Sequence, residues 1–346
     1  MGSKDVTFRE NKSPYGDRNE YEKARLASTS GRDCPAIDTH WHAWTKETCN
    51  SYKSLGKALF GYLYHKNFDD QDFIDFHPTE EEMVEHYRMH NAVGMPVGWD
   101  GETVFGDPPV PNEYIAHLVK TYPDVFLAGW VCVDPNKGYK AVKEIEKGIE
   151  KLNLIGVKFQ QAGQNFNMMD PQHKILWECI NSYGVPVQFH TGYTGLGSGA
   201  PGAQGIRLEF NRVFPHMEYI ASKYTNSKYF ALHVGDPWVD DVNAIARHME
   251  NVYRECSGMW PQYWPEDMWY ELNRRLKDKY VWGTDYPLFS TGETLTQISK
   301  LNDPKGLKGF KDEKTRQNVL WRNAINIFKD DFKRVGVDLS RWGVKD

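Results

Sequence analysis

Two histidines stand two residues apart near the start of the chain, in the run Asp38-Thr39-His40-Trp41-His42. Side chains alternate between the two faces of a β-strand, so His40 and His42 project from the same face if this run ends a strand. Two imidazoles on one face can bind a single metal ion. The pair can equally be two hydrogen-bonded core histidines, so the rest of the chain must decide between these interpretations.

Three further candidates for metal binding or catalysis each close an apolar run. They are the last residues of Val187–His190, Ala231–His233 and Trp282–Asp285. If these runs are parallel strands of a barrel, their carboxyl ends meet at one pocket. The imidazoles and the carboxylate then form a nitrogen and oxygen ligand set suited to zinc or another borderline divalent ion.

Short apolar runs and helical patterns alternate along the chain. The predicted strands are Ala36–Asp38, Ala92–Val97, Phe126–Val133, Leu154–Phe159, Val185–His190, Lys228–His233, Val252–Cys256 and Tyr280–Asp285. One predicted helix begins after Thr79. The other predicted helices are Tyr139–Leu152, Pro171–Tyr183, Pro215–Tyr224, Asp241–Met249, Trp264–Leu276 and Lys314–Phe328. Eight such units, with no G-x-G-x-x-G or P-loop after the first strand, favour a closed (β/α)₈ barrel over an open nucleotide-binding sheet.

The chain divides into two parts of different character. Residues 1–33 are polar, charged and without clear periodicity, so we predict an N-terminal extension followed by one barrel domain over residues 34–346. Two long segments follow predicted strands: Lys46–Pro78 is rich in aromatic residues, and Thr191–Pro215 is rich in glycine. Because barrel enzymes build active sites at carboxyl strand ends, we expect Lys46–Pro78 to be a lid over the pocket.

Composition and charge exclude several classes of protein. With 40% hydrophobic and 26% charged residues among 346, the chain is globular and not disordered. Its mean hydropathy is −0.66 and no apolar run approaches the ~18 residues of a membrane span. A net charge of −5 without basic runs argues against a nucleic-acid partner. Five scattered cysteines and a polar start predict a cytoplasmic protein with no secretory signal.

The motifs resemble the amidohydrolase superfamily, and within it the branch that holds aminocarboxymuconate-semialdehyde decarboxylase, resorcylate decarboxylases and several C–C and ester hydrolases. The resemblance spans residues 36–330 and rests on Asp38-x-His40-x-His42, His190, His233–Trp238 and Gly283–Pro287, which occur in the family's order. Shorter runs such as Trp99–Thr103, Val133–Gly138 and Tyr263–Pro265 resemble a bacterial subgroup described as amidohydrolases or 4-hydroxyphenyl-β-ketoacyl-CoA hydrolases.

The chain departs from that pattern at two places. Relatives read Lys-Phe-His-Pro where this chain has Lys158-Phe159-Gln160-Gln161. The subgroup reads His-Pro-Ser-Trp-Pro-Trp where this chain has His233-Val234-Gly235-Asp236-Pro237-Trp238. Both changes touch the wall of the pocket, so they bear on the identity of the substrate more than on the metal site.

The resemblance also implies roles for single residues. It implies one divalent metal ion, zinc first and manganese second, held by His40, His42, His190 and Asp285. His233 would then act as general acid and base, while Asp285 orients a metal-bound hydroxide or takes its proton. Lys158 has three interpretations: a substrate-binding cation, the carbamylated lysine of two-metal relatives, or a member of a structural ion pair.

Three other residues are candidates for substrate binding. Arg207, in the glycine-rich segment, could clamp a carboxylate or phosphate, and otherwise it is a solvated loop arginine. Trp99 and Trp238 could stack on an aromatic substrate, and otherwise they fill the packing of the barrel.

We therefore predict a metal-dependent hydrolase, in which a metal-bound hydroxide attacks a carbonyl of a small, aromatic or non-aromatic amide, ester or β-keto compound. The first alternative is a metal-dependent non-oxidative decarboxylase of an aromatic or unsaturated carboxylic acid. The second is a non-catalytic binding barrel. The expected partner is a small molecule, with no membrane contact, and a homo-oligomer is consistent with the resemblance.

Overall fold

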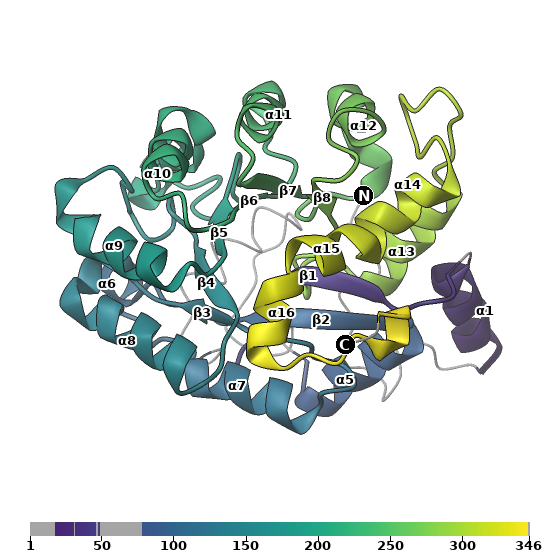
Figure 1. Ribbon diagram of the computed structural model, residues 1–346, viewed down its shortest axis with the longest axis horizontal. Helices are drawn as coiled ribbons and strands as arrows, with labels where there is room; N and C mark the ends of the chain where they lie inside the picture. The colour runs from purple at the N-terminus through teal and green to yellow at the C-terminus, as the bar shows by residue number, and fades with distance from the viewer. Residues whose placement is uncertain (1–17, 31, 46–47, 49–77, 345–346) are drawn as a thin grey trace.

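A computed structural model describes residues 18–30, 32–45, 48 and 78–344 of the chain. Eight parallel strands follow one another in chain order around a nearly closed barrel, and helices surround it (Figure 1). The (β/α)₈ fold predicted from the sequence is therefore confirmed.

The strands agree with the predicted runs in place but not in length. They are β1 (Ala36–His42), β2 (Ala92–Val97), β3 (Trp130–Cys132), β4 (Gly156–Phe159), β5 (Val187–His190), β6 (Tyr229–Leu232), β7 (Val252–Glu255) and β8 (Tyr280–Val281). β6 and β8 stop before His233 and Asp285, which have φ values of 68° and 62°. A left-handed backbone cannot continue a strand, so the chain turns at these two candidate site residues.

The helices form the outer layer. They are α1 (Arg18–Thr29), α5 (Glu80–Met89), α6 (Glu102–Phe105), α7 (Asn112–Thr121), α8 (Tyr139–Glu150), α9 (Lys174–Tyr183), α10 (Glu218–Lys223), α11 (Val239–His248), α12 (Glu266–Leu272), α13 (Thr291–Lys300), α14 (Glu313–Gln317), α15 (Asn323–Ile327) and α16 (Lys329–Val335). Thr79 caps α5 as predicted, in a capping box with Glu82. The sequence patterns did not predict α1, α6, α7, α13 or α16.

The core has an outer and an inner layer. On β4, Val157 and Phe159 pack toward the helices, and the Phe159 ring lies 5.5 Å from that of Trp177 on α9. Lys158 between them points to the inside of the barrel, as Gln188 and His190 do on β5. The period of two thus places apolar side chains outward and the candidate site residues inward.

Aromatic side chains close the amino-terminal end of the barrel. Phe328, at the start of α16, stacks on Phe230 of β6 at 4.7 Å and meets Trp130 of β3 at 5.8 Å between ring centroids. Phe332 and Trp342 belong to the same buried cluster. Because these side chains fill the amino-terminal end, a substrate pocket can form at the opposite, carboxyl end of the strands.

Part of the predicted N-terminal extension packs on the barrel. Helix α1 lies against α13, and Ser28 Oγ is 2.7 Å from His90 Nδ1 at the end of α5. Arg32 donates to the carbonyl oxygen of Asn91 at 2.7 Å. The predicted lid, Lys46–Pro78, lies outside the described residues except at Thr48 and Pro78.

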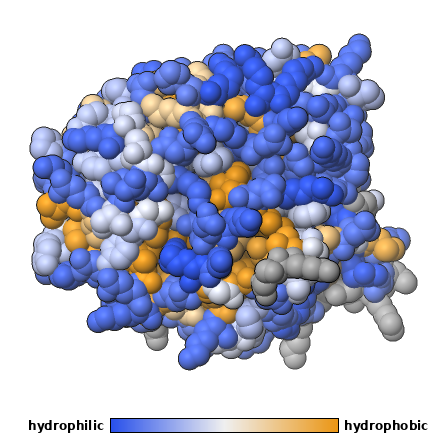
Figure 2. Space-filling view, in the orientation of Figure 1, coloured by the Kyte–Doolittle hydropathy of each residue, from blue (hydrophilic) through white to orange (hydrophobic). Residues whose placement is uncertain are grey.

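The outer surface in the view of Figure 2 is mainly hydrophilic, with apolar patches between the charged groups. Among the described residues, no helix combines the length and the apolar character needed to cross a bilayer.

The outer layer yields a test of the fold. Ile145 of α8 is fully buried, whereas Ile175 of α9 is 45% exposed. Ile145→Ala should lower the free energy of unfolding by about 2–5 kcal/mol, because it removes apolar contacts and leaves a cavity. Ile175→Ala, the matched control, should change it by less than about 1 kcal/mol. Urea denaturation measures both, and equal losses would contradict this packing.

Candidate metal centre

The closure of the barrel between β8 and β1 sets the position of the site. The backbone N–H of Thr39 donates to the carbonyl of Trp282 at 3.0 Å, and that of Asp285 donates to the carbonyl of His40 at 3.0 Å. The turn after β8 therefore lies directly beside the end of β1. This contact brings residues some 245 positions apart into one site.

The buried Asp38 carboxylate reinforces this closure. It accepts hydrogen bonds from Thr284 N at 3.0 Å, from Thr284 Oγ1 at 2.5 Å, from Tyr87 OH at 2.8 Å and from His40 N at 3.3 Å. Burial raises the pKa of Asp38 to about 7, and the bonds from Thr284 and Tyr87 limit the rise. Because the donors come from three elements, Asp38 fixes the neighbours His40 and Asp285 relative to each other.

Three of the four predicted metal ligands come together at this point. Asp285 Oδ1 lies 3.2 Å from His40 Nε2 and 3.6 Å from His42 Nε2. One ligand atom of each residue lies within 4.8 Å of the other two. The pairing of β1 with β2 is irregular between Asp38 and Trp41, and such a bulge re-aims side chains at the end of a strand.

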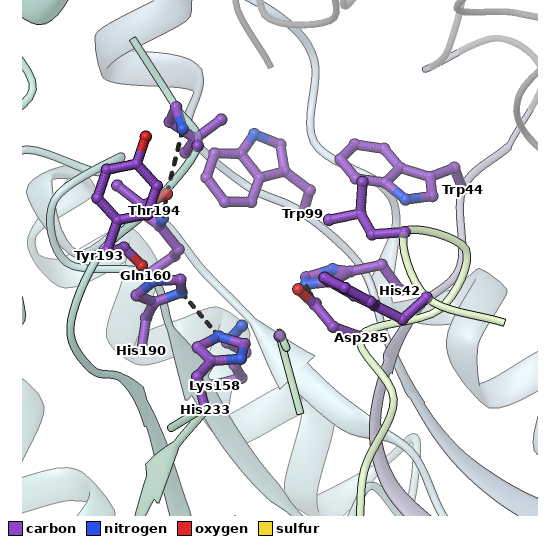
Figure 3. A pocket seen from close by; sticks show the side chains of 15 residues that line it. His42, Trp44, Trp99, Lys158, Gln160, His190, Tyr193, Thr194, His233 and Asp285 are labelled. Atoms are coloured by element: carbon purple, nitrogen blue, oxygen red, sulfur yellow. Dashed lines mark hydrogen bonds and ion pairs between the residues drawn. The ribbon is translucent and has the colours of Figure 1, made fainter. Parts of the chain in front are cut away.

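The other two candidate imidazoles contact each other and line the same cavity. His190 Nδ1 lies 2.9 Å from His233 Nε2, and His190 Nε2 lies 3.0 Å from the carbonyl oxygen of Tyr193 (Figure 3). The His233 ring is also 5.4 Å from the ring of His40. His190 thus borders the three-residue cluster but directs its hydrogen bonds to His233 and Tyr193.

The electrostatics keep the imidazoles neutral. Burial, followed by the charge of Lys158, holds the pKa of His40 and of His42 well below the usual range and lowers that of His190 to about 4. Burial alone would raise the pKa of Asp285, but the nearby His233, His42 and Lys158 more than offset it and lower it. Neutral imidazoles beside an ionised carboxylate are the donor set that a divalent metal ion requires, so these residues fit the ion.

Lys158 adds a buried cation to the site. Its Nζ lies 3.3 Å from His40 Nε2. Burial lowers its pKa to about 8, against the attraction of Asp285. The ammonium group is therefore largely charged at pH 7 and points into the cavity, where an anionic substrate group could neutralise it.

The cavity in front of these residues has a volume of about 340 Å³. Trp44 and Trp99 stack at 6.4 Å with an interplanar angle of 26° and form one wall (Figure 3). The full lining is His42, Trp44, Trp99, Lys158, Gln160, His190, Tyr193, Thr194, Gly195, Leu196, His233, Gly258, Asp285, Leu288 and Phe289. The site thus combines ligating groups with aromatic and aliphatic walls, as small-molecule sites do.

Two predicted substrate-binding residues do not line this cavity. Arg207 has a side chain that is 59% exposed, pairs with Glu209 and lies over the Phe210 ring. Trp238 lies beneath the guanidinium of Arg212 at 5.3 Å. Trp99, in contrast, belongs to the wall of the cavity.

Sequence reasoning missed several residues of the site. Trp44 and Gln160 follow His42 and Lys158 by two positions, so strand alternation could have found them. No residue of β7 was a candidate, although Glu255 and Ser257 lie behind His233. A glutamate at the carboxyl end of a predicted strand was the available signal.

Comparisons with known proteins agree with this architecture. The family model described as Amidohydrolase matches residues 37–329. No curated protein matches the sequence.

Similar solved structures share the fold at low sequence identity. An uncharacterized TIM-barrel protein of Bordetella bronchiseptica has a TM-score of 0.67 at 17% identity, over 87% of this chain and 99% of that one. A manganese-bound 5-carboxyvanillate decarboxylase of Novosphingobium aromaticivorans scores 0.63 at 14%, over 88% and 99%. A 2,6-dihydroxybenzoate decarboxylase from Rhizobium scores 0.56 at 16%, over 86% and 99%.

The donor set predicts metal content. The purified chain should carry about one equivalent of a divalent metal, and His40→Ala and His42→Ala should each lose most of it, because each removes one of a few ligands. His117→Ala is the matched control, since that side chain is 53% exposed and pairs with Glu80. Plasma mass spectrometry measures the content, and equal metal in all four proteins would contradict the assignment.

Proposed function

The chain belongs to the amidohydrolase family, whose members bind a divalent metal ion, and we propose that it is a metal-dependent non-oxidative decarboxylase of a hydroxylated aromatic carboxylic acid. The observation that carries this proposal is the cluster of His40, His42 and Asp285, which opens onto a cavity with stacked tryptophans on its wall. Decarboxylation, the first alternative to hydrolysis that the sequence suggested, thus becomes the main proposal.

We propose that His40, His42 and Asp285 hold one ion, zinc in the first place and manganese in the second. His190 would join them as a ligand by giving up its hydrogen bond to the carbonyl oxygen of Tyr193. When bound, the ion supplies a fixed positive charge that orients an anionic oxygen of the substrate and stabilises the charge that develops on it. The manganese in the Novosphingobium structure supports the second choice. The mixed imidazole and carboxylate set is compatible with both ions.

The walls of the cavity suit a planar ring with an anionic group. Trp44 and Trp99 offer a face on which an aromatic ring can stack, and Phe289 contributes a further ring to the lining. Among the described residues that line the cavity, Lys158 offers a cation that can bind the substrate carboxylate. Arg207, the arginine that the sequence suggested for this role, lies outside the lining.

His233 would move the proton that the reaction requires. Its pKa lies well below the usual range, first because it is buried and then because His190 is adjacent, so the ring is neutral at pH 7. We propose that Nε2 takes the proton of the substrate hydroxyl and delivers it to the ring carbon that bears the carboxylate. The carbon–carbon bond then breaks, its electron pair returns to the ring, and carbon dioxide leaves.

Hydrolysis, which the sequence placed first, has less support. Decarboxylation needs no attacking water, which accords with an apolar wall beside the ligands. The structural relatives named as decarboxylases of 5-carboxyvanillate and 2,6-dihydroxybenzoate also favour it. A non-catalytic barrel is less favoured still, because buried imidazoles, a lysine and carboxylates are costly to retain without a function.

Isotopic labelling separates the two reactions. With 5-carboxyvanillate, 2,6-dihydroxybenzoate and related hydroxybenzoates as probes in D₂O, the metal-loaded enzyme should release CO₂ and place deuterium on the carbon that bore the carboxylate. With aryl ester and amide probes in H₂¹⁸O, it should release no ¹⁸O-labelled acid. Mass spectrometry reads both, and ¹⁸O-labelled acids without any CO₂ release would contradict the proposal.

The Lys158 assignment makes a kinetic prediction. Lys158→Met should raise KM for the active benzoate by at least about tenfold, since it removes a charge-assisted contact to the carboxylate. Lys143→Met is the control, because that side chain is 55% exposed on α8. Metal content is measured in parallel because Lys158 adjoins His40, and an unchanged KM would show that the carboxylate binds elsewhere.

A further inference from the structure

The cavity has a polar side that the proposed reaction does not use. Gln160, directly after β4, and Thr194, after β5, both line the cavity, and they lie across it from His42 and Asp285 (Figure 3). Both side chains are buried, so water has little access to their polar atoms. Gln160 is also one of the positions at which the chain departs from the pattern of its relatives.

The backbone fixes the orientation of the Gln160 amide. The N–H of Gly163 donates to Gln160 Oε1 at 2.5 Å, and a backbone N–H can only donate, so this atom must be the oxygen. The amide nitrogen therefore faces Thr194, and Nε2 donates to Thr194 Oγ1 at 3.0 Å. A Cβ atom on Gly163 would collide with Gln160 Oε1, which shows how closely the chain packs around the amide.

The hydroxyl of Thr194 consequently has only its hydrogen to offer. Its oxygen accepts from Gln160 Nε2 and, at 3.3 Å, from the backbone N–H of Leu196. A hydroxyl has two lone pairs and one hydrogen, so both acceptor positions are taken. Among the described residues no acceptor receives the hydrogen, and a buried donor without an acceptor is unfavourable. A ligand in the cavity can supply that acceptor.

The two loops that carry these side chains are fixed relative to each other. Gln161 Nε2 donates to the carbonyl oxygen of His190 at 3.0 Å, and the backbone N–H of His190 donates to Gln161 Oε1 at 3.1 Å. The fully buried Gln164 accepts the backbone N–H of Gln160 at 3.0 Å. A wall held in this way presents the Thr194 donor to a ligand without rearrangement.

We propose that Thr194 is a specificity-determining residue, and that the substrate carries a hydrogen-bond acceptor, such as a carbonyl, carboxylate or methoxy oxygen, on the side of its ring away from the metal ligands. This inference rests on the proposed function, because it takes the substrate to be a hydroxylated aromatic acid whose reacting end lies at the metal ligands. Thr194 recognises the acceptor and takes no part in breaking the carbon–carbon bond.

Two ligands of matched shape test the donor. 5-Acetyl-2-hydroxybenzoate carries a carbonyl oxygen where 5-isopropyl-2-hydroxybenzoate has a methyl group, and the 4-substituted pair covers the other ring position. Calorimetry measures Kd of each ligand for the zinc-loaded full chain, and CO₂ release is followed in parallel. The ratio of the two Kd values is compared between variants, because the comparison cancels the general attraction of an apolar wall for the isopropyl group.

The preference for the acetyl ligand over the isopropyl ligand should fall by at least about fivefold in Thr194→Val, because valine keeps the shape but removes the donor. Thr194→Ala should show the same fall, so the test does not depend on one variant. Thr194→Ser keeps the hydroxyl and should retain the wild-type preference. Thr121→Val is the matched control, since Thr121 lies at the exposed end of α7.

The outcomes separate this inference from the proposed function. An equal preference in wild type and Thr194→Val, for both ligand pairs, would overturn the inference. An equal fall in Thr194→Ser and Thr194→Val would overturn it as well, because the shape of the side chain would then matter and not its hydroxyl.

A failure of the proposed function has a different signature. If the ligands bind with the expected preferences but no hydroxybenzoate releases CO₂, the donor is supported and the reaction is wrong. If none of the four ligands binds to wild type, the class of substrate is wrong and the inference fails with it.

Discussion

The hydrogen bonds between the buried Asp38 carboxylate and Thr284 are the constraint on which the rest of the site depends. Thr284 donates both its backbone N–H and its hydroxyl to Asp38, so the turn after β8 is attached to β1 at the carboxyl end of the barrel. His40 lies two residues after Asp38, and Asp285 directly follows Thr284. His40 Nε2 and Asp285 Oδ1 are therefore held 3.2 Å apart. If the turn after β8 were attached less firmly to β1, the same side chains would not be held close together.

The sequence allowed correct prediction of those features that depend on local pattern. Short apolar runs located all eight strands, and alternation along the first of them put His40 and His42 on one face. The left-handed backbone at His233 and Asp285 was not visible in the sequence, and the predicted runs extended past the ends of β6 and β8 at Leu232 and Val281. The neighbours of Arg207 depend on the path of a long loop, which no local pattern determines.

The site divides its tasks among elements of the barrel. β1 and the turn after β8 contribute the compact ligand cluster, β4 contributes the buried cation, and β7 supports the imidazole that follows β6. The opposite wall of the cavity is aromatic, with Trp44 and Trp99 stacked against each other. Such a division explains how one barrel scaffold keeps its metal chemistry while its substrates change.

The role of the contact between Asp38 and Thr284 is tested most directly by calorimetry. Zinc is titrated into the metal-free wild-type chain and into the metal-free Thr284→Val variant. Valine keeps the shape of the side chain but removes the hydroxyl that Asp38 Oδ2 accepts. We predict about one zinc ion per chain in wild type, and an affinity about 10–100-fold lower in the variant because its ligands are no longer held in place. Equal affinities, or no zinc binding by wild type, would contradict the account.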